Sequence, residues 1–131
     1  MSTDPHGKLI LVVDDDPLII RAVTGTLAMA GFRALVAEHG AAGLEAFLKH
    51  ADEIDLVLSD IVMPMMDGTT MAERIKKAKP DARILLMTAY SDAVIDLIND
   101  EKFPLVRKPF LPEDLLRAVK AQVGPTSAEA S

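Results

Sequence analysis

Short runs of aliphatic residues recur along the chain, and nearly every position within them is apolar. Runs of this length and composition are typical of β-strands that are covered on both faces, as in a parallel sheet. The runs span residues 9–13, 34–37, 56–58, 84–87 and, more weakly, 105–106. The pattern therefore predicts five strands, most of them buried.

The segments between these runs repeat their apolar residues every three or four positions, which is the spacing of one helix face. Asp16 followed by Pro17 is typical of a helix start, and Gly31 is typical of a helix end. The segments predicted as helices are residues 17–30, 42–50, 68–79, 93–98 and 113–123. Five strand–helix units predict a doubly wound parallel α/β sheet with helices on both faces.

Length and composition limit the possible classes of function. The chain has 131 residues, enough for one domain. Its 14 basic and 20 acidic residues give a formal net charge of −6, which disfavours direct binding to nucleic acid. It contains no cysteine and no apolar run long enough to span a membrane. We therefore expect a cytoplasmic domain over residues 8–123, with flexible ends at 1–7 and 124–131 and no output domain on this chain.

Carboxylates follow two of the predicted strands. Asp14, Asp15 and Asp16 come directly after the first strand, and Asp60 ends the third. Ligands of open parallel sheets bind outside the carboxyl ends of the strands, so these acids converge if the two strands are neighbours. Clustered carboxylates repel one another unless a divalent cation neutralises them, and oxygen ligands of this kind favour Mg²⁺.

A hydroxyl and an ammonium group are expected at the same edge of the sheet. Thr88 ends the fourth strand, and Lys108 follows the fifth. Such groups would hold an anion beside a metal, and phosphoryl transfer depends mainly on positioning and charge neutralisation. The chain has no glycine-rich phosphate loop, so nothing in it favours nucleotide binding.

Four segments in this order resemble the receiver domain of bacterial response regulators. They are residues 11–17, 59–68, 87–89 and 108–110. The resemblance implies the CheY-like, flavodoxin-like fold, with five parallel strands in the order 2-1-3-4-5. It also implies a stand-alone receiver of two-component signal transduction, which catalyses only its own phosphorylation and dephosphorylation.

The resemblance implies a phosphoacceptor and a magnesium site. Asp60 matches the aspartate that becomes an aspartyl phosphate. Asp15 and Asp60 would bind Mg²⁺ directly, together with the backbone carbonyl of Val62. Asp14 would act mostly through a metal-bound water.

Further roles and partners follow from the same resemblance. Lys108 would pair with the phosphoryl oxygens, and Thr88 would donate its hydroxyl to one of them. The peptide bond between Lys108 and Pro109 would be cis. The phosphoryl donor would be the phosphohistidine of a sensor histidine kinase or a histidine phosphotransferase, and the downstream target would be another protein.

Two features depart from the commonest receiver pattern. Leu105 stands where many members carry an aromatic residue that moves with Thr88. Val62 and Tyr90 lie where a water attacking the acyl phosphate would pass, and Val62 cannot orient that water by hydrogen bonding. We therefore expect slow self-dephosphorylation, and an activation change closer to Tyr90 and Ser91 than to the fifth strand.

Two alternative functions remain open at this stage. A phosphohydrolase of the haloacid-dehalogenase-like class also uses an aspartate after the first strand, and Asp14 and Asp16 have the required spacing. Leu18, however, stands where that class carries Thr or Val, and Asp16 is more simply explained as a helix cap. A receiver fold kept only for binding, and never phosphorylated, is the other alternative.

Overall fold

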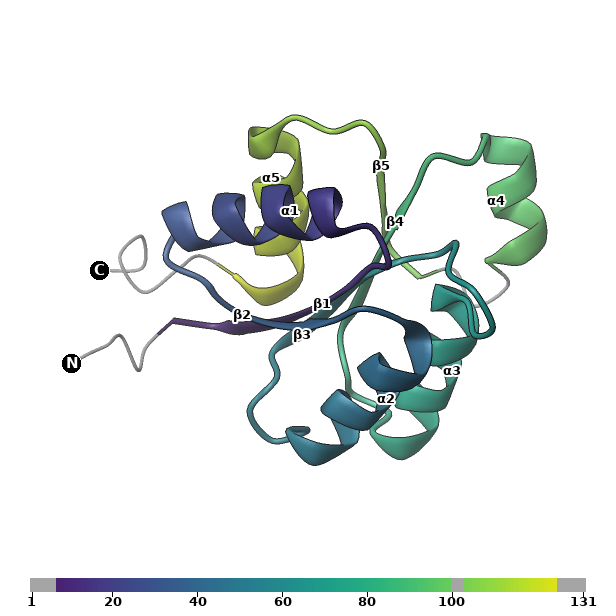
Figure 1. The fold of residues 1–131 in the computed structure, drawn as a ribbon, viewed down its shortest axis with the longest axis horizontal. Helices are drawn as coiled ribbons and strands as arrows, with labels where there is room; N and C mark the ends of the chain where they lie inside the picture. The colour runs from purple at the N-terminus through teal and green to yellow at the C-terminus, as the bar shows by residue number, and fades with distance from the viewer. Residues whose placement is uncertain (1–6, 100–102, 125–131) are drawn as a thin grey trace.

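The computed structural model describes residues 7–99 and 103–124. Strands and helices alternate along the chain, which confirms the predicted repeat of five strand–helix units (Figure 1). The elements are β1 (Leu9–Val13), α1 (Pro17–Met29), β2 (Arg33–Ala37), α2 (Gly40–Lys49), β3 (Leu56–Asp60), α3 (Gly68–Ala78), β4 (Ile84–Thr88), α4 (Asp92–Ile98), β5 (Leu105–Arg107) and α5 (Pro112–Val123).

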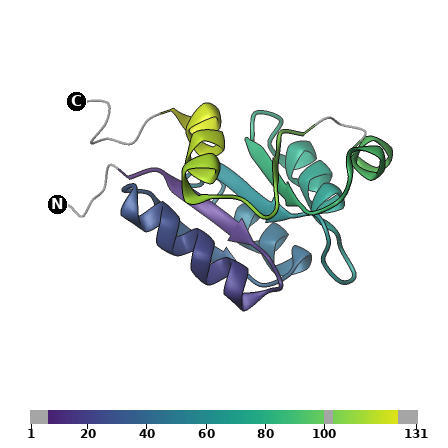
Figure 2. The same cartoon turned by 90° about the horizontal axis from the view of Figure 1, so that it is seen from above.

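The strands form one parallel sheet in the order β2-β1-β3-β4-β5, which confirms the expected topology. Helices α1 and α5 cover one face, and α2 and α3 cover the other (Figures 1 and 2). β1 lies beside β3, with Val13 opposite Ser59. Because the two strands are parallel, the residues that follow them meet at the same edge of the sheet.

Two apolar clusters fill the spaces between the sheet and its helix layers. In β1, Leu9, Leu11 and Val13 pack on the side of α2 and α3. Ile10 and Val12 pack on the side of α1 and α5. All five residues are buried, so coverage on both faces explains why this run is apolar at every position.

Strand β2 does not have the burial that its apolar sequence suggests. It forms the edge of the described sheet beside β1, and Ala34 and Val36 in it are exposed. Only its last residue, Ala37, is buried. The apolar run thus predicts the strand correctly but not its exposure, because an edge strand lacks a neighbouring strand on one side.

Side-chain caps set the starts of the first two helices. Asp16 caps α1 as predicted, because its Oδ1 accepts a hydrogen bond from the backbone N–H of Leu18 at 2.9 Å. Helix α2 begins at Gly40, earlier than the predicted residue 42. His39 caps it by accepting from the N–H of Ala42 at 3.1 Å, a role for which histidine is an uncommon choice.

The other helix boundaries lie within one residue of their predicted positions. The predicted flexible ends, 1–7 and 124–131, lie outside the described residues except for Gly7 and Gly124. Among the described residues, no helix is long and apolar enough to cross a membrane.

Candidate functional site

Three carboxylates converge where β1 and β3 end. Asp14 and Asp15 follow β1, and Asp60 is the last residue of β3. One carboxylate oxygen of each lies within 4.8 Å of the other two. Asp14 is completely buried, Asp60 is 7% exposed, and Asp15 is exposed. The structure thus brings together the acids that the sequence places at the two strand ends.

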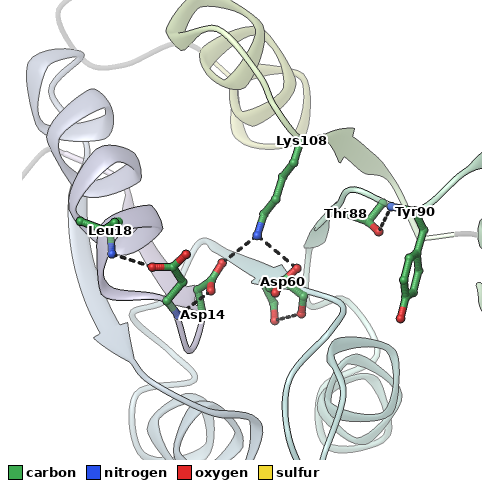
Figure 3. Close-up of polar contacts among 8 residues, drawn as sticks. Asp14, Leu18, Asp60, Thr88, Tyr90 and Lys108 are labelled. Carbon is green, nitrogen blue, oxygen red and sulfur yellow. Dashed lines mark hydrogen bonds and ion pairs between the residues drawn. The ribbon is translucent and has the colours of Figure 1, made fainter.

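Lys108 reaches this cluster from the loop after β5. Its Nζ lies 3.2 Å from Oδ2 of Asp14 and 3.3 Å from Oδ1 of Asp60 (Figure 3). The other oxygen of Asp14 accepts a hydrogen bond from the backbone N–H of Asp16 at 2.9 Å. The peptide bond between Lys108 and Pro109 is cis, as expected. Asp14 is therefore held on both of its oxygens, whereas Asp60 shares the ammonium with it.

The electrostatic environment leaves Asp60 only partly neutralised. Burial raises the pKa of the Asp60 carboxyl, the ammonium of Lys108 opposes the rise, and the carboxylate of Asp14 adds to it. The net direction is upward, so the charged form of Asp60 is less favourable than it is for an exposed aspartate. Three carboxylates against one ammonium leave excess negative charge, and their oxygens are the ligands that Mg²⁺ prefers. The donor set therefore fits a magnesium ion.

The loop after β3 is fixed on both sides of its turn. The N–H of Gly68 donates to the carbonyl of Ile61 at 2.8 Å. Asp67 caps α3, because its Oδ1 accepts from the N–H of Thr70 at 2.8 Å and from the hydroxyl of Thr69 at 2.9 Å. Although burial acts to raise the pKa of Asp67, these hydrogen bonds outweigh it and lower that pKa. Asp67 therefore has a structural role at the start of α3.

Thr88 lies at the buried end of β4, next to the acidic cluster (Figure 3). Its hydroxyl oxygen accepts a hydrogen bond from the backbone N–H of Tyr90 at 3.0 Å. The hydroxyl keeps its own proton for donation. Leu105, where an aromatic residue is common in receivers, is half-buried on β5.

Sequence reasoning gave no role to Arg107, which contacts the segment after β4. Its guanidinium donates to the carbonyl of Tyr90 at 2.7 Å and forms an ion pair with Asp92. Alternation along β5 could have suggested that Arg107 and Lys108 reach in different directions. The partners of Arg107 follow only from the pairing of β4 with β5.

The rim of the cluster is largely apolar. Val62 and Met65 are exposed in the loop after β3, and Met65 has a positive φ of 69°. Met63, in the same loop, is buried. Beside the cluster lies an apolar groove of about 320 Å³, lined by Ile19, Ala22, Val23, Ala89, Lys108, Pro109 and Phe110.

Comparisons with known proteins agree on one family. The family model of the response regulator receiver domain matches residues 10–120. The chemotaxis protein CheY of Bacillus subtilis is 35% identical over 113 residues, which cover 84% of this chain and 92% of that protein. The sensor kinase CckA of Brucella abortus is 31% identical over 122 residues, which cover 91% of this chain but only 13% of that protein.

A solved structure gives the same match. The response regulator protein TrrA of Thermotoga maritima, in complex with Mg²⁺ and BeF, has a TM-score of 0.80 and 38% sequence identity. The match covers 88% of this chain and 98% of that chain. The fold and the sequence therefore point to the same family.

Proposed function

The chain belongs to the response regulator receiver domain family, a signalling domain of two-component systems and not a classical enzyme, and on that premise we propose that Asp60 is its phosphoacceptor. The observation that carries the proposal is the position of Asp60. Its carboxylate lies at the end of β3, within 4.8 Å of two further carboxylates and 3.3 Å from the ammonium of Lys108. No support remains for the phosphohydrolase alternative.

Phosphoryl transfer requires an attacking oxygen and groups that stabilise the negative charge on the phosphoryl oxygens. An oxygen of Asp60 attacks phosphorus while the bond between phosphorus and the donor nitrogen breaks, and the bonding electron pair leaves with that nitrogen. Lys108 exchanges one of its carboxylate contacts for a phosphoryl oxygen. The hydroxyl of Thr88 donates to another phosphoryl oxygen, since its proton is not used by the contact with Tyr90.

The acidic cluster supplies the ligands for Mg²⁺. Asp15, Asp60 and the backbone carbonyl of Val62 would bind the ion directly. Asp14 would act through a water, because its two oxygens are already engaged by Lys108 and by the N–H of Asp16. When bound, Mg²⁺ neutralises negative charge on the attacking carboxylate and on the transferring group.

The proposed partners are proteins. The donor is the phosphohistidine of a sensor histidine kinase or a histidine phosphotransferase, consistent with the match to part of the sensor kinase CckA. The apolar groove beside Lys108 suits contact with a protein better than contact with a small polar donor. A downstream protein target and a cytoplasmic location remain predictions from the sequence.

Intact-protein mass after incubation with acetyl phosphate tests the proposal. We expect a gain of about 80 Da, one phosphoryl group, that requires Mg²⁺ and is lost in Asp60→Asn. Asp16→Asn is the matched control, because it removes a neighbouring carboxylate while asparagine still caps α1. This control should label like the wild type.

Other outcomes would contradict the proposal. Rapid and repeated release of inorganic phosphate from a small-molecule ester would indicate a phosphohydrolase, because a receiver with slow self-dephosphorylation releases phosphate only slowly. A folded wild-type protein that gains no mass and does not bind Mg²⁺ in a titration would indicate a receiver fold kept only for binding. Labelling of Asp60→Asn would place the acceptor elsewhere.

A further inference from the structure

The guanidinium group of Arg107 fastens the segment after β4 to β5. Its Nη1 donates to the carbonyl oxygen of Tyr90 at 2.7 Å, and its Nη2 forms an ion pair with Asp92 in the first turn of α4. The planar fork of arginine suits two acceptors at once, which the single ammonium of a lysine does less well. One side chain thus holds two points, 90 and 92, of the same short segment.

The peptide groups of Tyr90 continue this connection inward. The N–H of Tyr90 donates to Oγ1 of Thr88, and the carbonyl of Tyr90 accepts from Arg107. Thr88 is completely buried beside the acidic cluster, whereas the side chain of Asp92 is 90% exposed. A continuous set of polar contacts therefore leads from the buried end of β4 to the surface of α4. Figure 3 shows its innermost contact, between Thr88 and Tyr90.

Arg107 is also joined to the acidic cluster through the backbone. It precedes Lys108, whose Nζ contacts Asp14 and Asp60. The N–H of Lys108 donates to the carbonyl of Thr88 at 2.8 Å, and Arg107 lies opposite Thr88 in the pairing of the two strands. Arg107 is therefore adjacent in sequence to Lys108 and directly opposite Thr88 in the sheet.

We propose that Arg107 is a positioning residue that couples the acidic cluster to α4, by holding the segment 90–92 in its resting arrangement until phosphorylation shifts it. The proposal rests on the proposed function of Asp60. Leu105 lies two residues earlier on the same strand and carries no ring that could make this connection. The side chains of Arg107 and Asp92 are 47% and 90% exposed, and exposed ion pairs are weak, so a phosphoryl group can rearrange the contact.

The chain offers a direct readout, because Tyr90 is its only tyrosine and it has no tryptophan. Tyrosine emission therefore reports on Tyr90, the residue that Arg107 contacts. We would record it for the resting and the acetyl-phosphate-treated protein with Mg²⁺, in the wild type, Arg107→Ala and Asp92→Asn. Arg117→Ala is the matched control, since Arg117 forms an exposed ion pair with Asp114 on α5.

Resting Arg107→Ala is expected to emit like the phosphorylated wild type, and to show less than half of the wild-type change on phosphorylation. Its labelling by acetyl phosphate should be roughly twofold to fivefold faster, the size expected when an exposed ion pair no longer opposes the shift. In both measurements, Asp92→Asn should lie between the wild type and Arg107→Ala, since it keeps the hydrogen bond from Arg107 to Tyr90. Arg117→Ala should match the wild type in both measurements.

The proposed positioning role of Arg107 is contradicted if Arg107→Ala is phosphorylated normally and its tyrosine emission changes as much as that of the wild type. If Arg107→Ala has a different resting emission but shows the same change on phosphorylation as the wild type, the role of Arg107 is purely structural. Should Arg107→Ala fail to fold, as judged by circular dichroism, the comparison of Asp92→Asn with the wild type decides the question. Failure of the proposed function is distinct, because the wild type itself would then gain no mass, and the coupling would fall with it.

Discussion

Substitution of Gly68 by alanine is expected to destabilise the protein and to displace the backbone of Asp60 in the acidic cluster. Gly68 is the first residue of α3, and a Cβ placed on it would lie 2.2 Å from the carbonyl oxygen of Asp60. Ordinary contacts of this kind begin at 3.4 Å, so the two groups must separate by about 1.2 Å. The N–H of Gly68 is meanwhile bound to the carbonyl of Ile61 at 2.8 Å.

The magnitude follows from what the new methyl group meets. It meets backbone at the end of a buried strand, which cannot rotate away, so we expect Gly68→Ala to lower the free energy of unfolding by about 3 kcal/mol or more. Gly43→Ala would meet Sδ of Met71 at 2.7 Å and a methyl of Val13 at 2.9 Å. These are side chains that can adjust in part, and a cost of about 1–2 kcal/mol is expected there. Gly25→Ala meets nothing within 4 Å on α1 and should stabilise by about 0.5–1 kcal/mol.

Urea unfolding followed by far-ultraviolet circular dichroism would rank the three variants. The expected order of stability is Gly25→Ala above the wild type, then Gly43→Ala, then Gly68→Ala. Labelling by acetyl phosphate should also fall in Gly68→Ala under conditions where it is folded, because the displaced backbone carries Asp60. A Gly68→Ala variant within about 0.5 kcal/mol of the wild type would refute the reasoning, since the close approach would then be relieved at almost no cost.

Further predictions concern the charges and the loop beside the cluster. Asp60→Asn should raise the free energy of unfolding at pH 7 by about 1–2 kcal/mol, the scale of a buried and partly compensated charge. Because the pKa of Asp60 is raised in the folded state, its protonated form stabilises the wild type fully below the unfolded pKa, and this stabilisation is lost as the pH rises through the folded pKa. The stability gained by Asp60→Asn should therefore shrink in acid. A gain that does not change with pH would contradict a raised pKa for Asp60. Mg²⁺ should raise the melting temperature of the wild type more than that of Asp60→Asn. Asp67→Ala should cost about 1 kcal/mol through loss of the α3 cap. Because the pKa of Asp67 is lowered in the folded state, the stability lost in Asp67→Ala should be largest above the unfolded pKa and decline as the pH falls through the folded pKa. A loss of stability that does not change with pH would argue against a charged cap. Val62→Asn should shorten the lifetime of the mass adduct at least severalfold by orienting a water, and equal lifetimes would contradict the expected slow hydrolysis.

Local signals predicted some details well and others poorly. Asp16 and Pro17 are favoured at a helix start, and α1 begins there. His39 is an uncommon cap, so the sequence pattern predicts a later start for α2 than Gly40, where the helix begins. The apolar sequence of β2 predicted a strand but not its exposure, because position in the sheet depends on the order of strands and not on the residues of one strand.

The contacts of Arg107 show where local reasoning ends. Its partners Tyr90 and Asp92 lie between β4 and the first turn of α4. A sequence pattern carries no information on which exposed carboxylate an arginine will meet. The exposure of Met65 is likewise not readable from a local sequence pattern. It depends on a turn whose positive φ is set by the loop as a whole, and methionine is not a residue that signals such a turn.

The sequence alone predicts the alternation of strands and helices, because the period of apolar residues differs between the two. It also determined which carboxylates, hydroxyl and ammonium stand at the ends of strands. How these groups meet depends on the tertiary fold. Lys108 contacts Asp14 across 94 positions of sequence, because the parallel order β2-β1-β3-β4-β5 collects the carboxyl ends of separate strands at one edge, and burial there sets the charge balance of Asp60.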